Sequence, residues 1–340
     1  MAEPTHEAIL WSKAAGGSVD CSLCSHRCHI VDGKRGVCGA RQNRGGTLFS
    51  LVYGRLIAEH MDPIEKKPLY HFLPGSLSYS IATPGCNFRC TFCQNWQISQ
   101  VEAAPAFDSI SYVAPERVVS AAVAGGAPSI SYTYTEPTIF MEYALDCARL
   151  ARREGLKNVF VTNGFQTPEA VQAMTGLIDA ANVDLKAFTD EFYRRQCAGR
   201  LQPALDTISN MHRAGIHIEV TTLIVPGRND SDEQLSGIAR FLADLSPDIP
   251  WHISRFHPDY KETALPPTPV ETMRRANEFG REAGLHYVYL GNVQLDAGQD
   301  TKCPGCGKVL VRRRGFGRPS LYLTEPRCPD CGHDVPLVLR

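Results

Sequence analysis

The stretch of sequence that decides the fold is residues 78–96, which read SYSIATPGCNFRCTFCQNW. Residues 78–83 alternate in the manner of a β-strand, and a loop with the spacing C-x3-C-x2-C follows at once. Thiolates are soft ligands that favour iron–sulfur clusters, and a [4Fe–4S] cube held by three of them keeps one iron open for chemistry. Zinc is the alternative, but a structural zinc closes with a fourth ligand, which this loop does not offer. The three candidate ligands are Cys86, Cys90 and Cys93.

Around this loop, strand-like and helix-like segments alternate from residue 78 to about residue 291. Pro115 and Pro168 suit the first turns of two of the helices. Repeated βα units predict a parallel sheet in an α/β fold, and six full units predict a partial (β/α)6 barrel of the TIM type. The cysteine loop follows the first strand and so lies at the C-terminal face of the barrel, where chemistry takes place. The expected strands are 78–83, 129–134, 157–162, 181–186, 216–225 and 251–256, with a short final strand at 286–290.

Two further groups of cysteines predict metal modules at both ends of the chain. Thirteen cysteines in a chain that lacks an export signal read as metal ligands rather than disulfides. The N-terminal cysteine group suits either a closed zinc site or a second [4Fe–4S] cluster, and comprises Cys21, Cys24, Cys28 and Cys38. The C-terminal cysteine group has the C-x2-C…C-x2-C spacing of a zinc ribbon, and comprises Cys303, Cys306, Cys328 and Cys331. Outside these groups, Cys147 is expected in the core and Cys197 carries no distinctive signal.

These patterns divide the 340 residues into three predicted parts: a Cys-rich N-terminal module with its lead-in over 1–75, the barrel over 76–295 and the ribbon over 296–340. Residues 298–301 read as a linker before the ribbon. The net charge of −1 argues against a whole-surface nucleic-acid binder. The ribbon still contains a local run of basic residues: Arg312, Arg313, Arg314 and Arg318. This run suits a surface that binds nucleic acid or an acidic partner, and it equally suits a solvated face.

No run of about 18 apolar residues occurs, so no membrane span is expected. Residues 1–7 are acidic and polar, unlike a signal peptide. Together these features predict a cytoplasmic protein.

A strand that leads into C-x3-C-x2-C, with the aromatic Phe92 just before the last cysteine, resembles the signature of the radical S-adenosylmethionine (SAM) enzymes. The resemblance implies that the amino and carboxylate groups of SAM chelate the open iron. It further implies that an electron from the cluster cleaves SAM to a 5′-deoxyadenosyl radical, which abstracts hydrogen from a substrate. Phe92 and Gln94 are then expected among the cofactor-binding residues.

The second strand ends in YTYTEP, residues 132–137, where radical SAM enzymes carry Gly-Gly-Glu. Tyr134 and Thr135 replace the two glycines, and Glu136 matches the glutamate. The resemblance implies that Thr135 and Glu136 lie at the amino group of SAM, because backbone carbonyls there accept hydrogen bonds from an ammonium. The same residues also suit a helix start capped by Thr135, and the two interpretations are compatible.

The third and fourth strands end in VTNGF and DLK, which resemble the pyruvate formate-lyase activating enzyme. The resemblance implies that Thr162 and Asp184 ligate a monovalent cation, and that Asn163 and Leu185 line SAM. Lys186 is expected to pair with the methionyl carboxylate of SAM as a charge-assisted donor. A buried ion pair between Asp184 and Lys186 is the alternative.

The sixth strand runs into WHISRFHP, residues 251–258. In the activating enzymes the corresponding strand ends in a histidine that approaches SAM, and His257 matches it. His252 alternates to the other side or to the barrel interior, where it is expected to be a hydrogen-bonded core residue.

Three further runs, at 62–72 (DPIEKKPLYHF), 93–96 (CQNW) and 99–100 (SQ), resemble the radical SAM member of the AmmeMemoRadiSam system, which is grouped with the activating enzymes. This implies a one-electron donor of the flavodoxin or ferredoxin type, a small-molecule or protein substrate, and a Memo-like partner protein. A glycyl-radical-enzyme activase is the alternative enzyme. A non-catalytic, metal-folded RNA- or protein-binding protein is the alternative of another class, and the open-iron loop on the catalytic face of a barrel argues against it.

Overall fold

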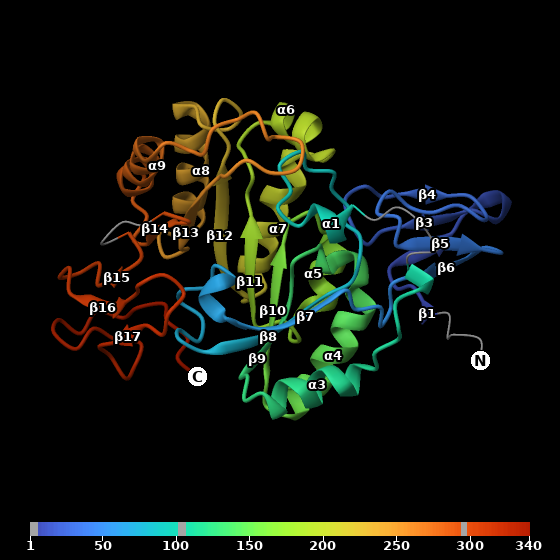
Figure 1. The fold of residues 1–340 in the computed structure, drawn as a ribbon, viewed down its shortest axis with the longest axis horizontal. Helices are drawn as coiled ribbons and strands as arrows, with labels where there is room; N and C mark the ends of the chain where they lie inside the picture. Colours follow the sequence, from blue (N-terminus) through green and yellow to red (C-terminus); the bar gives the residue numbers. More distant parts are fainter. Residues whose placement is uncertain (1–5, 101–106, 294–297) are drawn as a thin grey trace.

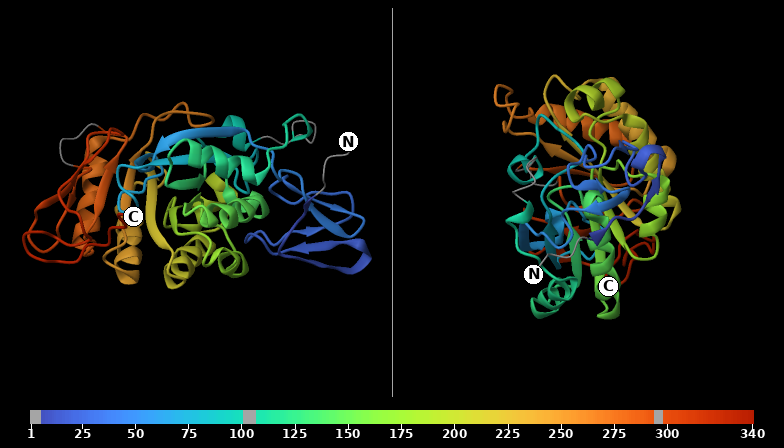
Figure 2. Two further views of the ribbon diagram at one scale, coloured as in Figure 1. Left: turned by 90° about the horizontal axis from the view of Figure 1, so that it is seen from below. Right: turned by 90° about the vertical axis from the view of Figure 1, so that its right-hand side faces the viewer.

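A computed structural model of the chain describes residues 6–100, 107–293 and 298–340. The first five residues of the acidic segment 1–7 therefore lie outside the described part. Figure 1 shows a central α/β body with the N-terminal strands at one side and the C-terminal ribbon at the opposite side. Figure 2 shows the same separation from below. The two outer cysteine groups are thus carried to opposite ends of the molecule.

The centre of the body is an eight-stranded sheet in which strands β7 to β14 follow one another in chain order. Strands β8 to β14 pair in parallel, and β7 pairs with β8 in the antiparallel sense. This topology confirms the predicted partial barrel. The strands are β7 (Ala58–Pro63), β8 (Leu77–Ala82), β9 (Ser129–Tyr132), β10 (Lys157–Thr162), β11 (Ala180–Asp184), β12 (His217–Ile224), β13 (Trp251–Arg255) and β14 (Val288–Gly291).

Helices follow the strands and cover the outside of the sheet (Figures 1 and 2). Pro115 and Pro168 stand in the first turns of α3 and α5, as predicted, because a helical first turn does not need their missing N–H groups. The main helices are α3 (Pro115–Ala124), α4 (Met141–Arg153), α5 (Pro168–Met174), α7 (Leu201–Arg213), α8 (Asp232–Leu245) and α9 (Val270–Glu282). Shorter turns are α1 (Trp96–Ser99), α6 (Asp190–Phe192), the 3-10 turns η1 (Ala15–Gly17), η2 (Ile64–Lys66) and η3 (Pro137–Phe140), and the π-turn η4 (Tyr193–Cys197).

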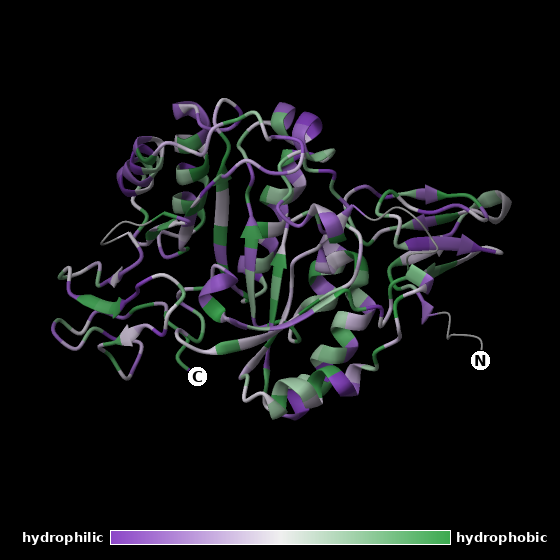
Figure 3. Cartoon of the chain, in the orientation of Figure 1, coloured by the Kyte–Doolittle hydropathy of each residue, from purple (hydrophilic) through white to green (hydrophobic). Residues whose placement is uncertain are grey.

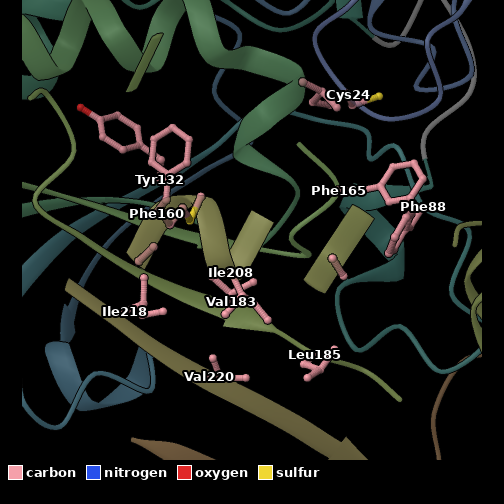
Figure 4. Close-up of a cluster of buried hydrophobic side chains, with 14 of the residues drawn as sticks. Cys24, Phe88, Tyr132, Phe160, Phe165, Val183, Leu185, Ile208, Ile218 and Val220 are labelled. Carbon is pink, nitrogen blue, oxygen red and sulfur yellow. The ribbon is translucent and has the colours of Figure 1, made fainter. Parts of the chain in front are cut away.

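One continuous hydrophobic core joins the barrel to the N-terminal strands. Figure 4 shows Tyr132 and Phe160 on one side of this core and Phe88, Phe165 and Cys24 on the other. The rings of Phe88 and Phe165 lie 5.0 Å apart. Figure 3 shows the central strands β10 and β11 as mainly hydrophobic, as expected for a sheet covered on both faces. Cys147 is fully buried within α4, as predicted.

Residues 64–73, here called the floor segment, close the end of the barrel at which the strands begin. Ile64, Leu69 and Phe72 pack against Val159 and Ala180 near the starts of β10 and β11. The segment's backbone is held by a buried carboxylate, which is described next. Because this end is filled, the opposite end of the barrel is the one available for a site.

Glu219 anchors the floor segment from the start of β12. Its carboxylate accepts the backbone N–H groups of Tyr70 at 3.0 Å and His71 at 2.8 Å, and it lies 2.6 Å from Nε2 of His252. His252 is 5% exposed, which confirms it as a hydrogen-bonded core histidine. These contacts pair the buried charge of Glu219 with donors on every side.

The outer pieces are built from short antiparallel sheets. The N-terminal strands are β1 (His6–Glu7), β2 (Trp11–Lys13), β3 (Val19–Cys21), β4 (His29–Ile30), β5 (Arg41–Arg44) and β6 (Thr47–Ser50), and the ribbon strands are β15 (Thr301–Lys302), β16 (Val309–Arg312) and β17 (Ser320–Leu321). Strand β7 lies within residues 1–75 yet belongs to the central sheet. The predicted domain boundaries stay predictions.

Two interpretations of the C-terminal sequence were wrong. Arg313 is buried rather than part of an exposed basic run, because its guanidinium donates to the carbonyls of Tyr70 and Gln299. Residues 298–301 are not a free linker, because the backbone N–H of Arg313 donates to Asp300 at 2.9 Å and Thr301 begins β15. Within the described residues, none of the helices combines the length and apolar character needed to cross a bilayer.

Candidate metal and cofactor site

The cysteine loop, residues 83–96, leaves the end of β8 and is held by backbone hydrogen bonds to η4 and to α1. Arg89 and Thr91 donate their N–H groups to the carbonyls of Cys197 and Gln196 in the π-turn η4, each at 2.9 Å. Gly85 donates to Ile98 at 2.9 Å. The loop is thereby fixed at the C-terminal end of the barrel, as the strand-then-loop pattern predicts.

The loop thiols lie among donors suited to a bound metal. The backbone N–H of Phe88 reaches Sγ of Cys86 at 3.4 Å, and Sγ of Cys93 lies 3.2 Å from the hydroxyl of Ser99. Burial, together with the nearby Glu136, raises the pKa of the Cys86 thiol. Metal binding therefore replaces protons at these sulfurs. Three thiols with donors and no fourth cysteine in the loop fit a [4Fe–4S] cluster with one open iron.

Glu136 is the hub of the neighbouring strand end. Its buried carboxylate accepts the backbone N–H groups of Thr138 at 3.0 Å and Asn163 at 2.8 Å, and the hydroxyl of Thr162 at 2.7 Å. Burial raises the pKa of Glu136, although these hydrogen bonds act in the opposite direction. Glu136, not Thr135, caps η3, because the Thr135 hydroxyl turns back to donate to the carbonyl of Thr83 at 2.8 Å. The predicted Thr135 cap was therefore wrong.

Tyr134 explains how this strand end tolerates the loss of a glycine. Its φ of 62° lies in the left-handed region that glycine adopts readily and other residues rarely. The strained backbone is held by the amide of Asn95, which donates to the Tyr134 carbonyl at 2.8 Å. The Tyr134 hydroxyl donates to Asp62, and Nζ of Lys67 lies 4.4 Å from the centre of the Tyr134 ring. These contacts to Asp62 and Lys67 were not predicted from the sequence.

Asp184 and Lys186 form the ion pair that was the alternative to a ligand role, with Nζ and Oδ2 2.7 Å apart. Burial lowers the pKa of Lys186, but the charges of Asp184 and the Cys90 thiol act against it and the net shift is upward. The Lys186 ammonium lies 6.0 Å from the centre of the Phe92 ring in the cysteine loop. Leu185 is fully buried between hydrogen bonds to β12. The Thr162 hydroxyl donates to Glu136, whereas Asp184 pairs with Lys186, so the two predicted cation ligands have different partners among the described residues. The predicted cation site stays a prediction.

Two predicted residues from distant parts of the chain meet directly. Nε2 of Gln94 lies 3.2 Å from Nδ1 of His257, which joins the cysteine loop to the segment after β13. Trp96 stacks on Tyr260 of the same segment, with ring centres 5.2 Å apart. This contact places His257 beside the cysteine loop, and its predicted approach to SAM stays a prediction.

Cys197 is a neighbour of the site that the sequence did not reveal. It is fully buried in the π-turn η4, and π-turns are often found at functional sites. A hydrogen bond with the Cys197 thiol, together with burial, raises the pKa of Cys90. A lone cysteine in a helix-like run gives no sequence signal for such a contact.

The two outer cysteine groups differ in geometry. The four sulfurs of the C-terminal cysteine group lie within 4.8 Å of one another. Among the described residues, the N-terminal cysteine group does not form so tight a set. A cavity of about 680 Å³ also opens where the N-terminal part meets the barrel. Its lining, which includes Ser25, Gln166 and Arg200, contains none of the predicted SAM residues.

Comparison with known proteins identifies the fold family. The model of the Radical SAM superfamily matches residues 80–242, which include the cysteine loop and the strand ends described above. The chain belongs to the radical SAM superfamily. This agrees with the family predicted from the cysteine spacing.

The chain is similar to two curated proteins and to one solved structure. "Uncharacterized protein MJ0808" of Methanocaldococcus jannaschii is 43% identical over 338 residues, which cover 98% of this chain and 99% of that protein. "Putative glycyl-radical enzyme activating enzyme MJ1632" of the same organism is 25% identical, over 52% of this chain and 66% of that protein. The solved structure of Streptococcus suis SuiB bound to precursor peptide SuiA has a TM-score of 0.50 at 15% identity, and covers 68% of this chain and 52% of that chain. The last likeness supports the radical SAM fold alone.

Proposed function

We propose that this chain is an enzyme that binds a [4Fe–4S] cluster at Cys86, Cys90 and Cys93 and uses it to cleave SAM reductively. When bound, the cluster and SAM supply a 5′-deoxyadenosyl radical, which abstracts hydrogen from a substrate that remains to be identified. The observation that carries the proposal is a loop with three thiols at the open end of a barrel whose other end is filled. Membership of the radical SAM superfamily supports it.

The surrounding side chains have distinct roles in this proposal. Lys186 neutralises the methionyl carboxylate of SAM, because its ammonium lies beside the cysteine loop and stays charged. Glu136 orders the backbone of Asn163 and Thr138, so that the strand end presents fixed groups to the amino group of SAM. Gln94 and His257 close the loop against the segment after β13. Thr162 and Asp184 remain candidate ligands of a monovalent cation.

The outer parts complete the proposal. The C-terminal cysteine group holds a structural zinc, because four sulfurs already lie at single-ion spacing. A flavodoxin- or ferredoxin-type protein supplies one electron, and thirteen cysteines without a disulfide suit the reducing cytoplasm. Division into parts at residues 1–75, 76–295 and 296–340 belongs to the same proposal.

Two classes of substrate are candidates. A protein substrate, as in a glycyl-radical-enzyme activase, is favoured by the relatives that carry that name. A small molecule, or a protein other than a glycyl-radical enzyme, with a Memo-like partner is the other candidate. It goes with the AmmeMemoRadiSam resemblance of the 62–72 run, which forms the end of β7 and most of the floor segment. The non-catalytic RNA-binding alternative is weakened because Arg313 of the basic run is buried.

The test is anaerobic turnover of the reconstituted full chain with SAM and dithionite. We expect 5′-deoxyadenosine to form, and the paramagnetic resonance signal of the reduced cluster to shift when SAM is added. A variant with Cys86, Cys90 and Cys93 all changed to alanine should lose both, whereas Cys147→Ala, which changes a buried core cysteine, should keep both. Formation of 5′-deoxyadenosine by the triple variant would overturn the proposal.

A further inference from the structure

We propose that Cys21, Cys24, Cys28 and Cys38 hold a second [4Fe–4S] cluster, which passes an electron to the cysteine loop. The relay role rests on the proposed function, whereas the presence of the cluster does not. Four features of the structure carry the inference: the spacing of the thiols, their burial, the donors around them, and the contacts of the surrounding segment with the cysteine loop.

Spacing separates this group from a single-ion site. In the C-terminal cysteine group, Sγ of Cys303 lies 3.5 Å from Sγ of Cys331, and Sγ of Cys306 lies 3.6 Å from Sγ of Cys328. Four thiolates that share one tetrahedral zinc must come this close. Within the described residues, the N-terminal cysteine group does not gather in that way. Wider spacing suits a cube, because each thiolate then binds a different iron.

The N-terminal thiols are nevertheless close enough for their charges to interact, and they are shielded from water. Cys21, Cys24 and Cys38 are each less than 10% exposed, and Cys28 is half-buried. By contrast, Cys306 and Cys331 of the ribbon are exposed. A buried cluster with four protein ligands has no open iron for substrate, which fits electron transfer rather than chemistry.

Hydrogen-bond donors are already arranged around these sulfurs. Nη1 of Arg41 lies 3.4 Å from Sγ of Cys21, and the backbone N–H of Val37 lies 3.5 Å from Sγ of Cys28. Arg41 is 1% exposed, and its Nε has no hydrogen-bond partner among the described residues. The inorganic sulfides of a cube offer further acceptors near Cys21, whereas a zinc ion with four thiolates does not. Donors to sulfur are among the factors that set the reduction potential of such clusters.

The group touches the cysteine loop through its own ligand backbone. A Cβ built on Gly85 would lie 3.5 Å from the carbonyl oxygen of Cys38, an ordinary contact distance, so the two backbones lie side by side here. The guanidinium of Arg89 bridges the same boundary, because it donates to the carbonyl of Val37 at 2.8 Å and to that of Cys86 at 2.7 Å. Arg89 thus links Val37, the residue before Cys38, to Cys86 through the carbonyls that accept its hydrogen bonds.

A third contact completes this boundary. Nε2 of His26 lies 2.8 Å from the carbonyl oxygen of Asn87, directly after Cys86. His26 itself stands between Cys24 and Cys28. The electron step balances simply: a flavodoxin- or ferredoxin-type donor loses one electron, the N-terminal cluster gains it, and the cluster at the cysteine loop then takes it over, with no bond formed or broken.

Metal content tests the cluster in the full chain. The probe is ferrous iron with sulfide, loaded anaerobically into the variant with Cys86, Cys90 and Cys93 changed to alanine. We expect about four irons to remain per chain, with a reduced-state resonance signal that SAM does not alter. Changing Cys21, Cys24, Cys28 and Cys38 to alanine in the same variant should remove that iron.

The outcomes separate the two proposals. Two zinc ions and no iron in the loop variant would overturn the second cluster, even if the parent protein cleaves SAM. Four irons in the loop variant, with no SAM cleavage by the parent, would overturn the proposed function and leave the second cluster in place. Because the loop variant keeps every N-terminal ligand, this measurement does not depend on whether the N-terminal variant folds.

The relay itself is tested at Arg89. Arg89→Lys keeps the charge but cannot bridge the carbonyls of Val37 and Cys86 with a planar fork. We expect reduced flavodoxin to reduce the loop cluster severalfold more slowly in this variant, as followed by freeze-quench resonance. Dithionite, a small reductant, is run in parallel, and the slowing with flavodoxin should exceed any slowing with dithionite. Equal rates with flavodoxin in parent and variant would overturn the relay.

Discussion

The N-terminal and C-terminal cysteine groups each consist of four cysteines, and they belong to parts that lie on opposite sides of the central body (Figure 1). The N-terminal group meets the end where the strands finish: Ser25 donates its N–H to the carbonyl of Phe165, and the hydroxyl of Thr167 donates to the carbonyl of Ser22. The ribbon meets the filled end, where Leu73 of the floor segment donates its backbone N–H to the carbonyl of Val338 near the C-terminus. The number of cysteines therefore does not predict the function of a cysteine group, which depends on the part of the barrel that the group contacts.

The N-terminal part and the ribbon also differ in the hydrophobic core that stabilises them. The ribbon has a small core of its own that includes Leu310, Val311 and Leu323, and this core also takes in Tyr70 and Tyr289 of the barrel. The N-terminal strands instead share the core of the barrel. Loss of metal should therefore unfold the ribbon locally, whereas the N-terminal fold should depend more on buried pairs inside the shared core.

The largest effect is expected from Cys328→Ala in the ribbon. Cys328 is 1% exposed, and structural zinc contributes about 10–16 kcal/mol to the folding of small zinc-binding peptides. Zinc content should fall to near zero, and trypsin should cleave the ribbon at its exposed arginines, while the iron content stays at the parent level. Zinc analysis and limited proteolysis measure this, with Cys147→Ala as the control. Unchanged zinc would show that this group is not the zinc site.

The next effect is expected at the N-terminal end, in Glu142→Ala. Glu142 pairs with Arg41, and both side chains are 1% exposed, so the variant leaves a buried guanidinium without its counter-charge. Breaking a buried pair costs about 3–5 kcal/mol. Denaturant unfolding should show the loss. The control is Asp334→Asn in the ribbon, where the pair with Arg327 is exposed and no measurable change is expected. Equal stability of the two variants would contradict the contrast between the ends.

The barrel could be predicted from the sequence because strand-like and helix-like segments alternate regularly along the chain. The predicted strand 157–162 is observed over the same residues, and 78–83 is observed one residue earlier. Strand β7 was missed: its sequence, AEHMDP, lacks alternation and ends in proline, and its antiparallel pairing with β8 is a tertiary property. The floor segment was recognised only as a resemblance, because its burial depends on the starts of β10 to β13.

The site was predictable where motif and strand end coincide. The approach of His257 to the cysteine loop follows from the barrel, since both stand at strand ends. The contact of Tyr134 with Asp62 could not be predicted, because it needs the missed strand β7 and an uncommon backbone conformation. Arg313 was misassigned because a run of charges predicts a surface, while its carbonyl partners lie on the floor segment and beside β15.

A smaller effect is expected at the open end of the barrel, in Lys186→Ala. The variant removes the cation beside the cysteine loop, and a charge-assisted contact is worth about 1.5–3 kcal/mol, or about ten- to a hundredfold in affinity for SAM. Isothermal titration of SAM into the anaerobic holoprotein measures it. Iron content should be unchanged, because Lys186 is not a ligand. A parent-like affinity would remove Lys186 from the SAM site while leaving the fold assignment intact.

The smallest effect is expected at the filled end, where His71 reports on the docking of the ribbon. Its ring lies between the hydroxyl of Tyr289 at 2.6 Å and the carbonyl of Pro336 at 3.2 Å, and burial lowers its pKa to about 3. Below pH 6.5, the ordinary pKa of histidine, His71 binds a proton in the unfolded chain but not in the folded protein. The free energy of unfolding therefore falls as the pH falls.

Between pH 6.5 and pH 5.5, proton uptake by His71 in the unfolded chain lowers the free energy of unfolding by about 1 kcal/mol. Thermal unfolding of the zinc-loaded protein across that range should show the loss in the parent, and a smaller slope in His71→Gln, which cannot titrate. The variant keeps a donor toward one partner, so it should be weaker than the parent near pH 7.5 and approach it at pH 5.5. Parallel pH profiles for parent and variant would show that another group governs the acid sensitivity of the ribbon end.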